Sequence, residues 1–275
     1  WWSKDTIAVV TGANKGIGYE ITRQLAKEGV TVILTARNQN LGMLSTEKLR
    51  AEGLNIDFHT LDVCSTDSIC SLAQHINQKY GGFDILVNNA GIADPENTYE
   101  KGKLVIETNY VGVKNVTRML LPLLKASTSG ARIVNVSSHL GQLERAKNAT
   151  LIQQMTDIDN LTEEKIDAFV ECFLDDFKLG NFSSRGWPQT YSAYTISKVA
   201  LNAYSRVLAQ DLSNRPEGQQ IYVNSMAPGF VKTDINRNAG IFSPAEGADT
   251  AVWLALLPRG GPTGQFFYQR KYLAY

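Results

Sequence analysis

The chain has 275 residues, long enough for one large α/β domain, and 43% of them are hydrophobic, which suits a globular core. Its 27 basic and 27 acidic residues cancel and no basic block stands out, which argues against nucleic acid or an anionic membrane as the main partner. No apolar run approaches the roughly 20 residues that a membrane span needs.

Short β-branched runs alternate with longer amphipathic stretches, which is typical of a parallel sheet covered by helices. Most runs are continuously apolar, as strands buried on both faces are. The predicted strands are 7–10, 31–35, 56–62, 85–88, 132–136, 221–225 and 265–267, and the predicted helices are 16–28, 42–51, 66–80, 103–124, 191–214 and 244–257. The crossover rule then favours a Rossmann-type, doubly wound α/β sheet of about seven parallel strands in the order 3-2-1-4-5-6-7.

A glycine-rich turn, TGANKGIG at 11–18, follows the first predicted strand and opens a helix. This strand–turn–helix context is what a dinucleotide-binding turn requires. Gly12 permits the tight turn, Gly16 lets the backbone approach a pyrophosphate, and Gly18 allows close helix packing. The N-terminus of the helix supplies free N–H groups. Because the spacing differs from the common G-x-G-x-x-G, an ordinary glycine-rich loop is the alternative.

The end of the second predicted strand bears on the choice of cofactor. A site for NAD usually places Asp or Glu there to hold the ribose 2′-hydroxyl. Here the chain reads LTARN at 34–38, with Arg37 and no acid. Lys15, inside the glycine-rich turn, can converge on the same spot. Two cations without a carboxylate favour a 2′-phosphate, hence NADPH, whereas the alternative is that Arg37 is solvated surface.

The stretch between the fifth predicted strand and the helix 191–214 has no strand pattern. Thr162, followed by two acids, indicates the start of a helix over 162–178. Its apolar stripe consists of Ile166, Phe169, Val170, Phe173, Leu174 and Phe177. We expect a single domain over 1–275 with 139–190 as a helical insertion. We also expect the helix to pack on its own domain, a docking surface for a second chain being the alternative.

Cysteine usage indicates a reducing compartment. Cys64, Cys70 and Cys172 are an odd, widely spaced set that fits neither a disulfide framework nor a metal site. We therefore expect a cytoplasmic protein without a bound metal. No secretory signal precedes the first predicted strand. Because the chain begins with Trp1 rather than Met, a targeting segment ahead of it is an open alternative.

Taken together, the motifs resemble those of the short-chain dehydrogenase/reductase family over essentially the whole chain. They are the turn 11–18, Leu61-Asp62-Val63, Asn88-Asn89-Ala90-Gly91, Asn109, Val136-Ser137-Ser138, Tyr194-x-x-x-Lys198 and Pro228-Gly229. The insertion and the phrases NKGIG (14–18) and PGFVKT (228–233) are similar to one branch. That branch holds monomeric carbonyl reductases and plant menthone-, neomenthol- and salutaridine-type reductases.

The resemblance implies a nicotinamide cofactor and assigns roles to the residues that match. The expected NADPH-binding residues are Gly12, Asn14, Lys15, Gly16, Ile17, Gly18, Arg37, Asp62, Val63, Asn89, Ala90, Gly91, Tyr194, Lys198, Pro228, Gly229, Val231 and Thr233. The expected catalytic residues are Asn109, Ser138, Tyr194 and Lys198.

The chemistry of a carbonyl reduction explains why a tyrosine and a lysine are needed. Hydride addition leaves an alkoxide that needs a proton, and Tyr194 is the expected general acid. A free tyrosine has a pKa near 10, but a cation about 4 Å away contributes roughly 4 kcal/mol at an effective dielectric of about 20, or about three pKa units. Lys198 lies four residues later on a predicted helix and faces the same side.

The other two catalytic candidates leave alternatives open. Ser138 lies at the carboxyl end of a strand and can orient the carbonyl oxygen, although the residues alone do not separate it from Ser137. The resemblance gives Asn109 the role of holding a water that relays protons to Lys198. A helix-interior Asn making a local backbone contact is the alternative. A hydrolase built on Ser138-His139 is disfavoured, because the nucleophile-elbow motif is absent.

Two other tyrosine–lysine pairs have the same spacing. Tyr99–Lys103 spans Gly102 in a predicted loop, so no helical register aligns it. Tyr110–Lys114 is in a predicted helix, but no serine-bearing strand end precedes it. Only the pair that begins at Tyr194 has both a helix and an upstream serine strand.

We therefore expect an NADPH-dependent reductase that converts a ketone or aldehyde of a small apolar substrate, such as a terpenoid, to the alcohol. The candidate residues of the substrate wall are His139, Leu140, Trp187, Tyr191, Met226 and Phe230. Reduction of an enone C=C bond, found in the same branch, is one alternative, and a non-catalytic NADPH-binding scaffold is another. Because the insertion helix could cover the long helices through which many family members pair, we expect a monomer.

Overall fold

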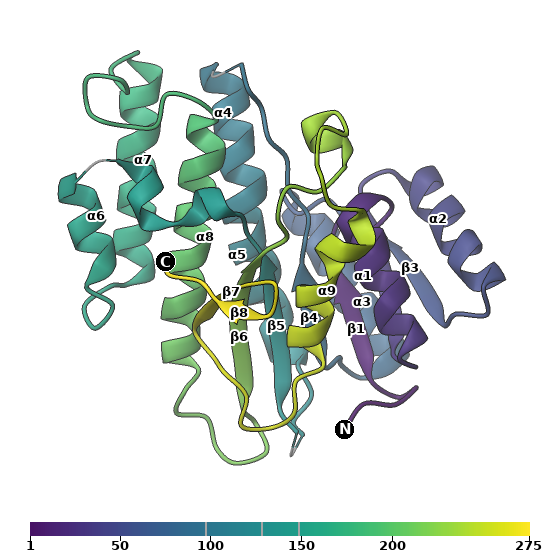
Figure 1. Cartoon of the computed structure of the whole chain (residues 1–275). Coiled ribbons are helices and arrows are strands. Elements are labelled where there is room, and N and C mark those ends of the chain that lie inside the picture. Colours follow the sequence, from purple (N-terminus) through teal and green to yellow (C-terminus); the bar gives the residue numbers. More distant parts are fainter. Residues whose placement is uncertain (97, 128, 148) are drawn as a thin grey trace.

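The apolar runs of the sequence form the strands of one eight-stranded sheet (Figure 1). This computed structural model describes residues 1–96, 98–127, 129–147 and 149–275, without the side chains of 149–151. The strands are β1 (Ile7–Val10), β2 (Thr31–Ala36), β3 (Ile56–Thr60), β4 (Ile85–Asn88), β5 (Ala131–Val136), β6 (Ile221–Ala227), β7 (Gln265–Tyr268) and β8 (Lys271–Tyr272). Their order is β3-β2-β1-β4-β5-β6-β7-β8, which confirms the predicted order and adds the short β8, antiparallel to β7.

Helices cover both faces of the sheet (Figure 1). They are α1 (Gly16–Lys27), α2 (Gln39–Ala51), α3 (Thr66–Tyr80), α4 (Tyr99–Ile106), α5 (Gly112–Leu120), α6 (Ala149–Thr156), α7 (Glu163–Lys178), α8 (Ser192–Asp211) and α9 (Pro244–Ala255). Side chains alternate along each strand. As a result, Ala8 and Val10 join a core with α1 and α9, whereas Ile7 and Val9 join the core under α3, α5 and α8. None of the described helices is long and apolar enough to span a membrane.

The helix predicted over 103–124 is interrupted at its centre. Its backbone runs from α4 through a π-helical turn (Glu107–Val111) into α5 and a final 3-10 turn (Leu121–Leu123). α4 begins at Tyr99, so the prediction of a loop around Gly102 was wrong. A Cβ at Gly102 would lie 2.4 Å from the ring of Phe177, so glycine here reflects close helix packing rather than a turn. π-helical turns inside helices occur frequently at functional sites.

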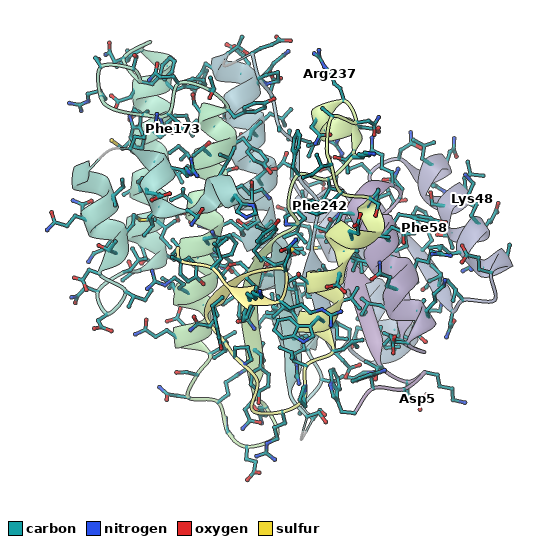
Figure 2. All side chains as sticks on the ribbon, in the orientation of Figure 1. Asp5, Lys48, Phe58, Phe173, Arg237 and Phe242 are labelled. Carbon is teal, nitrogen blue, oxygen red and sulfur yellow. The ribbon has the colours of Figure 1, made fainter. Side chains whose placement is uncertain are left out.

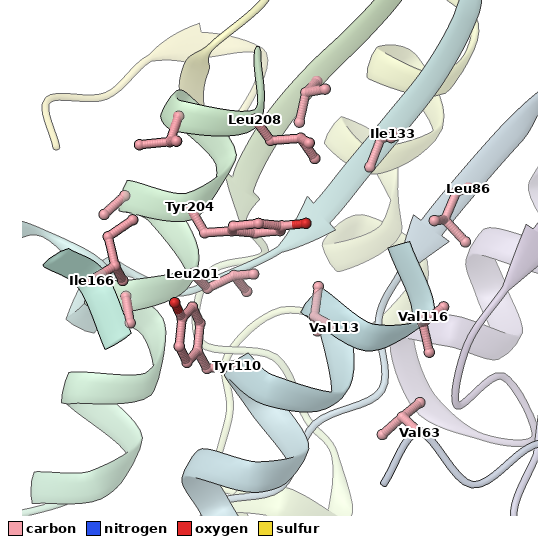
Figure 3. Packing of buried hydrophobic residues seen from close by; sticks show 14 of the residues in the cluster. Val63, Leu86, Tyr110, Val113, Val116, Ile133, Ile166, Leu201, Tyr204 and Leu208 are labelled. Carbon is pink, nitrogen blue, oxygen red and sulfur yellow. The ribbon is translucent and has the colours of Figure 1, made fainter. Parts of the chain in front are cut away.

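The insertion between β5 and α8 is helical, as predicted. Its described residues form two 3-10 turns (His139–Gly141 and Leu143–Ala146), α6 and α7. Thr162 caps α7 by accepting a hydrogen bond from the Lys165 N–H at 3.4 Å. The stripe residues Ile166 and Phe173 are fully buried, and Ile166 lies beside Tyr110 and Leu201 (Figure 3). Phe173 lies farther along α7 (Figure 2). The structure therefore confirms that α7 packs on its own chain.

The second tyrosine–lysine pair has a structural role in this packing. Tyr110 donates a hydrogen bond to Asp167 Oδ1 at 2.8 Å, and Lys114 donates to both carboxylate oxygens of Asp167 at 2.6 and 2.7 Å. Lys114 also lies 3.0 Å from Glu163. Since the Lys114 side chain is only 10% exposed, its charge depends on these two acids of α7. Tyr110 and Lys114 thus attach the insertion to the π-helical turn and to α5.

Asp167→Ala should therefore lower the free energy of unfolding by about 1–3 kcal/mol, because the buried Tyr110 phenol loses its acceptor and the buried Lys114 ammonium keeps only Glu163. Urea denaturation would measure the change. Glu171→Ala, on the exposed face of the same helix, is the matched control and should stay within about 0.5 kcal/mol of the parent. Equal free energies of unfolding for the two variants would show that the contacts of Asp167 with Tyr110 and Lys114 do not stabilise the fold.

Candidate active site

The carboxyl ends of the parallel strands open into one cavity of about 970 Å³. Its walls come from the glycine-rich turn after β1, the ends of β2 to β5, the first turns of α8, and the segment after β6. β1 and β4 are parallel neighbours in the sheet although β2 and β3 lie between them in sequence, so the order in which successive strands are added reverses there. In open α/β sheets a crevice at this point is the usual ligand site.

The glycine-rich turn is held against the end of β4 by a polar clamp. Thr11 Oγ1 accepts the backbone N–H groups of Asn89 and Ala90, both at 3.0 Å. In return, the amide of Asn89 donates to the carbonyl oxygens of Thr11 and Gly12 at 3.0 Å each. A Cβ on Gly18 would lie 2.4 Å from that amide nitrogen, so the clamp leaves no room for a side chain.

Gly12 is required for the shape of the turn. Its φ of +63° lies in the left-handed region that side chains disfavour. An added Cβ would also lie 2.8 Å from the Ala90 Cα. The backbone of the glycine-rich turn therefore packs directly on the backbone at the end of β4, without a side chain between them.

The N-terminus of α1 faces the cavity as an anion site. Lys15 occupies the cap position in an extended conformation, and its side chain makes no capping hydrogen bond. The first turn of α1 contains no acidic residue. Its N–H groups and the positive end of the helix dipole are therefore available to a phosphate group. This feature fits the pyrophosphate of a dinucleotide.

The two predicted phosphate-binding cations lie in different settings. Lys15 Nζ pairs with Asp234 Oδ2 at 2.7 Å, an acid that no sequence motif singled out. Arg37 is exposed at the cavity edge and makes no side-chain hydrogen bond or ion pair within the described part of the chain. Asn38 caps α2 by accepting the Leu41 N–H at 3.0 Å, so no acid occupies the end of β2. The position where NAD sites hold a ribose hydroxyl carries a free cation instead.

All residues predicted to bind the cofactor line this cavity. Asp62, beyond β3, accepts the Cys64 N–H at 3.0 Å and so shapes the turn in which it lies. On the opposite wall, Pro228, Gly229, Val231 and Thr233 follow β6. Tertiary structure thus brings together motifs that are more than 200 positions apart in the chain.

The structure separates the two adjacent serines. Ser138 is half-buried, lines the cavity and forms a hydrogen bond with the Tyr194 hydroxyl. Ser137 also borders the cavity, but it is only 2% exposed, and its Oγ has no hydrogen-bond partner among the described residues. A Cβ on Gly141 would lie 2.8 Å from that Oγ, so the Ser137 hydroxyl is directed at the backbone behind the cavity wall. The geometry therefore favours Ser138 as the group that contacts a substrate.

Tyr194 and Lys198 share one face of α8, with the ammonium near the aromatic ring. Lys198 Nζ lies 5.7 Å from the centre of the Tyr194 ring and donates to the Val136 carbonyl oxygen at 2.8 Å. Burial lowers the pKa of Lys198 to about 8. Burial also raises the pKa of Tyr194, and the hydrogen bond with Ser138 offsets only part of that change. The expected lowering of the tyrosine pKa is therefore absent in the chain alone, because desolvation is the largest effect on Tyr194 and only Ser138 opposes it.

Asn109 lies in the π-helical turn, fully buried behind the cavity wall. Its Oδ1 accepts the Ile92 N–H at 2.9 Å, and its Nδ2 donates to the Ile92 carbonyl oxygen at 2.8 Å and to Ser197 Oγ at 3.1 Å. The contact is therefore with a distant segment rather than the local backbone contact considered as its alternative. Asn109 ties the segment after β4 to α8.

Four of the six candidate substrate residues line the cavity: His139, Leu140, Tyr191 and Phe230. Trp187 and Met226 do not, which corrects the expectation. Trp187 is buried against Phe169 and Phe173, with its indole N–H bonded to Asp176 at 2.8 Å.

Met226 points into the core between the sheet and α9 and has no exposed surface. Proximity to a motif in sequence could not reveal which way either side chain points. Ile92, Ala93 and Ile235 also line the cavity, although no sequence signal marked them.

Comparison with known proteins agrees with this arrangement. A family model described as short chain dehydrogenase matches residues 6–152, and one described as Enoyl-(Acyl carrier protein) reductase matches 180–260. A (+)-neomenthol dehydrogenase of Capsicum annuum is 42% identical over 96% of this chain and 96% of its own length. Carbonyl reductase [NADPH] 1 of Mus musculus is 40% identical over 98% of each chain. The solved structure of salutaridine reductase from Papaver somniferum matches with a TM-score of 0.89 at 40% identity, covering 96% of this chain and 99% of that chain.

The buried ammonium of Lys198 predicts a measurable pH dependence of stability. Between its pKa of about 8 in the folded chain and its ordinary value of 10.5, the unfolded chain keeps a proton that the folded chain has released. The unfolded state then binds more protons, so stability rises with pH in this window. Relative to Lys198→Met, the parent should gain about 2 kcal/mol of unfolding free energy between pH 7.5 and 10.

Urea denaturation at a series of pH values would measure this difference. Lys27→Met, at an exposed position on α1, controls for the loss of one charge and should show no such window. A constant difference between parent and Lys198→Met from pH 7.5 to 10 would contradict the lowered pKa.

Proposed function

We propose that this chain, which belongs to the short-chain dehydrogenase/reductase family, uses NADPH to reduce a ketone or aldehyde of a small apolar substrate to the alcohol. One observation carries the proposal. The hydrogen-bonded pair Ser138–Tyr194 and the buried Lys198 share a cavity with an uncapped helix N-terminus and the unpaired cation of Arg37. Ser138, Tyr194 and Lys198 suit a carbonyl oxygen, whereas the helix N-terminus and Arg37 suit a phosphorylated dinucleotide.

The residues on the cofactor side fit NADPH in three respects. The α1 N-terminus and the close-packed glycine-rich turn would hold the pyrophosphate. Arg37 would hold the 2′-phosphate, with Lys15 as a second cation. Pro228, Gly229, Val231 and Thr233 would line the nicotinamide end. When bound, the dinucleotide would supply the hydride.

The chain itself would supply orientation and the proton. The hydroxyl groups of Ser138 and Tyr194 converge, so both can donate hydrogen bonds to one carbonyl oxygen. The raised pKa of Tyr194 keeps its proton in place at neutral pH until negative charge develops on that oxygen. Tyr194 then gives up the proton as general acid, and in the reverse direction its phenolate accepts it.

Lys198 would stabilise the phenolate left by this transfer. At about 6 Å and an effective dielectric of about 20, its ammonium contributes roughly 3 kcal/mol, or about two pKa units. Its own pKa of about 8 leaves it largely protonated at pH 7. The Val136 carbonyl fixes the ammonium in place, and Asn109 supports the neighbouring segment at Ile92. Delivery of protons through a water held near Asn109 is part of this proposal.

The substrate end of the cavity favours an apolar compound. Leu140, Tyr191, Phe230 and Ile235 line it, and Phe230 is 52% exposed at the mouth. His139 packs edge-on against Tyr268, with ring centres 4.3 Å apart, so its ring forms a wall. Burial lowers the pKa of His139, which favours its neutral form. Relatives named for neomenthol and salutaridine support a terpenoid or similar bulky ketone.

Enone reduction is the second candidate, because the model that matches 180–260 carries the name of an enoyl reductase. Tyr194 favours carbonyl reduction, since hydride addition at a β carbon does not require a tyrosine at that place. Oxidation of NADPH with a panel of ketones, aldehydes and enones, followed by product identification, distinguishes the two. A chain that binds NADPH but oxidises it with no substrate would be a scaffold.

We further propose that the protein is a cytoplasmic monomer and that it forms a single domain in which 139–190 is an insertion. α7 packs on α4 and α8. This packing supports a monomer, because the insertion covers the outer surface of the helices through which many family members pair. The described cysteines are all unpaired, which supports a reducing compartment.

Tyr194→Phe should reduce the rate of carbonyl reduction by 100-fold or more, because the general acid is lost while the ring remains. NADPH affinity, measured by calorimetry, should stay within about threefold. Tyr99→Phe is the matched control, since Tyr99 also precedes a lysine by four residues but lies outside the cavity lining. Near-parental turnover by Tyr194→Phe would overturn the assignment.

Arg37→Asp should weaken NADPH binding about 10- to 100-fold, because it replaces a charge-assisted contact with repulsion. NADH affinity should hold or improve, since an acid at this place can accept the ribose 2′-hydroxyl. Calorimetric titration with both cofactors measures the ratio. An unchanged NADPH affinity would mean that Arg37 is a solvated surface residue that does not contact the cofactor.

A further inference from the structure

A single ion pair joins the glycine-rich turn to the segment after β6 across the cavity. Lys15 Nζ lies 2.7 Å from Asp234 Oδ2, each side chain is 65% exposed, and both residues line the cavity. It is the one hydrogen bond or ion pair between 11–18 and 228–242 in the described chain. Below it, the two walls approach closely, because a Cβ on Gly16 would lie 3.3 Å from Thr233 Cγ2.

The segment that carries Asp234 is otherwise bonded mainly to itself. Lys232 N donates to the Phe242 carbonyl oxygen at 2.8 Å, and Asn236 Nδ2 donates to the Val231 carbonyl oxygen at 2.8 Å. At its tip, Arg237 has a left-handed φ of +54° and points away from the sheet (Figure 2). The segment is thus a self-contained unit whose polar link to the glycine-rich turn is Asp234.

The charges in this part of the cavity set up a competition. Lys15 already has an anionic partner, whereas Arg37 has none in the part of the chain that the structure describes. A 2′-phosphate bound between these cations would approach the ammonium that Asp234 already holds. One ammonium can donate to two acids, as Lys114 does, but a dianionic phosphate and the Asp234 carboxylate on Lys15 would repel each other, and the phosphate is the stronger acceptor.

We propose that Asp234 is a specificity-determining residue that competes with the 2′-phosphate of NADPH for Lys15. This inference rests on the proposed use of NADPH. Binding of the phosphate breaks the Lys15–Asp234 pair and releases the segment after β6 from the glycine-rich turn. NADH has no 2′-phosphate and leaves the pair intact. Asp234 therefore weakens NADPH binding selectively, and it couples the phosphate to the segment that bears Phe230 and Ile235.

Asp234→Asn tests this by calorimetric titration of the full chain with NADPH and with NADH. Because exposed ion pairs contribute little, the expected change is a two- to fivefold tightening for NADPH, with NADH affinity unchanged. Glu217→Gln is the matched control, because it removes one charge from an exposed 2.7 Å pair with Arg259 outside this cavity. It should alter neither affinity. Unchanged or weaker NADPH binding by Asp234→Asn would overturn the competition.

A double-mutant cycle with Lys15→Met separates competition from simple repulsion. Without Lys15 there is nothing to compete for, so Asp234→Asn should no longer tighten NADPH binding. Equal tightening with and without Lys15 would mean long-range repulsion and would overturn the proposal. If the binding results hold but no carbonyl compound is reduced, the proposed function fails while the role of Asp234 stands. If the parent binds NADPH and NADH equally, the proposed cofactor and the competition fail together.

Discussion

The hydrogen bond from the Lys198 ammonium to the Val136 carbonyl oxygen joins α8 to the end of β5, and the arrangement of the site depends on it. Ser138 lies directly beyond that strand end, and Tyr194 lies one helical turn before Lys198. Fixing the helix on the strand therefore fixes the two hydroxyl groups relative to each other. The ammonium is buried without a carboxylate partner among the described residues, and this burial is costly and lowers its pKa. Other polar contacts hold α8 in the same position: Asn202 donates to the Gly141 carbonyl oxygen at 2.9 Å, and Asn135 donates to Ser205 at 2.8 Å.

The same helix also supports the insertion on its outer side. α7 packs on α8, and its aromatic side chains enclose Trp187 on the approach to the first turn of α8. Tyr110 of the π-helical turn and Lys114 of α5 both donate hydrogen bonds to Asp167 of α7. The insertion is therefore tied to both helices that back the site. Its first residues, His139 and Leu140, line the cavity directly, whereas its aromatic core contributes only through the position of Tyr191 and α8.

The cavity has two chemically different ends. One is lined by backbone N–H groups and by cations from the glycine-rich turn and the end of β2, and the other by apolar side chains around Ser138 and Tyr194. The segment after β6 borders both ends, with Asp234 at the first and Phe230 at the second. The proposed role of Asp234 would couple the two ends through this one segment. In the proposed function, the phosphorylated cofactor would occupy the first end and the apolar substrate the second.

The sequence by itself predicted the strand order correctly, and it proposed a cofactor turn and one of the three tyrosine–lysine pairs; that turn and that pair line one cavity. These depend on local periodicity and on short motifs whose residues are neighbours along the chain. Tertiary structure decided what depends on side-chain direction and on long-range contacts. It placed Tyr99 in a helix because Phe177 packs on Gly102, and it turned Trp187 and Met226 into the core. It also showed that burial raises the pKa of Tyr194, and it joined Lys15 to Asp234, 219 positions away. No spacing rule can anticipate such contacts, because packing between distant segments sets both the distance between two groups and their exposure to water.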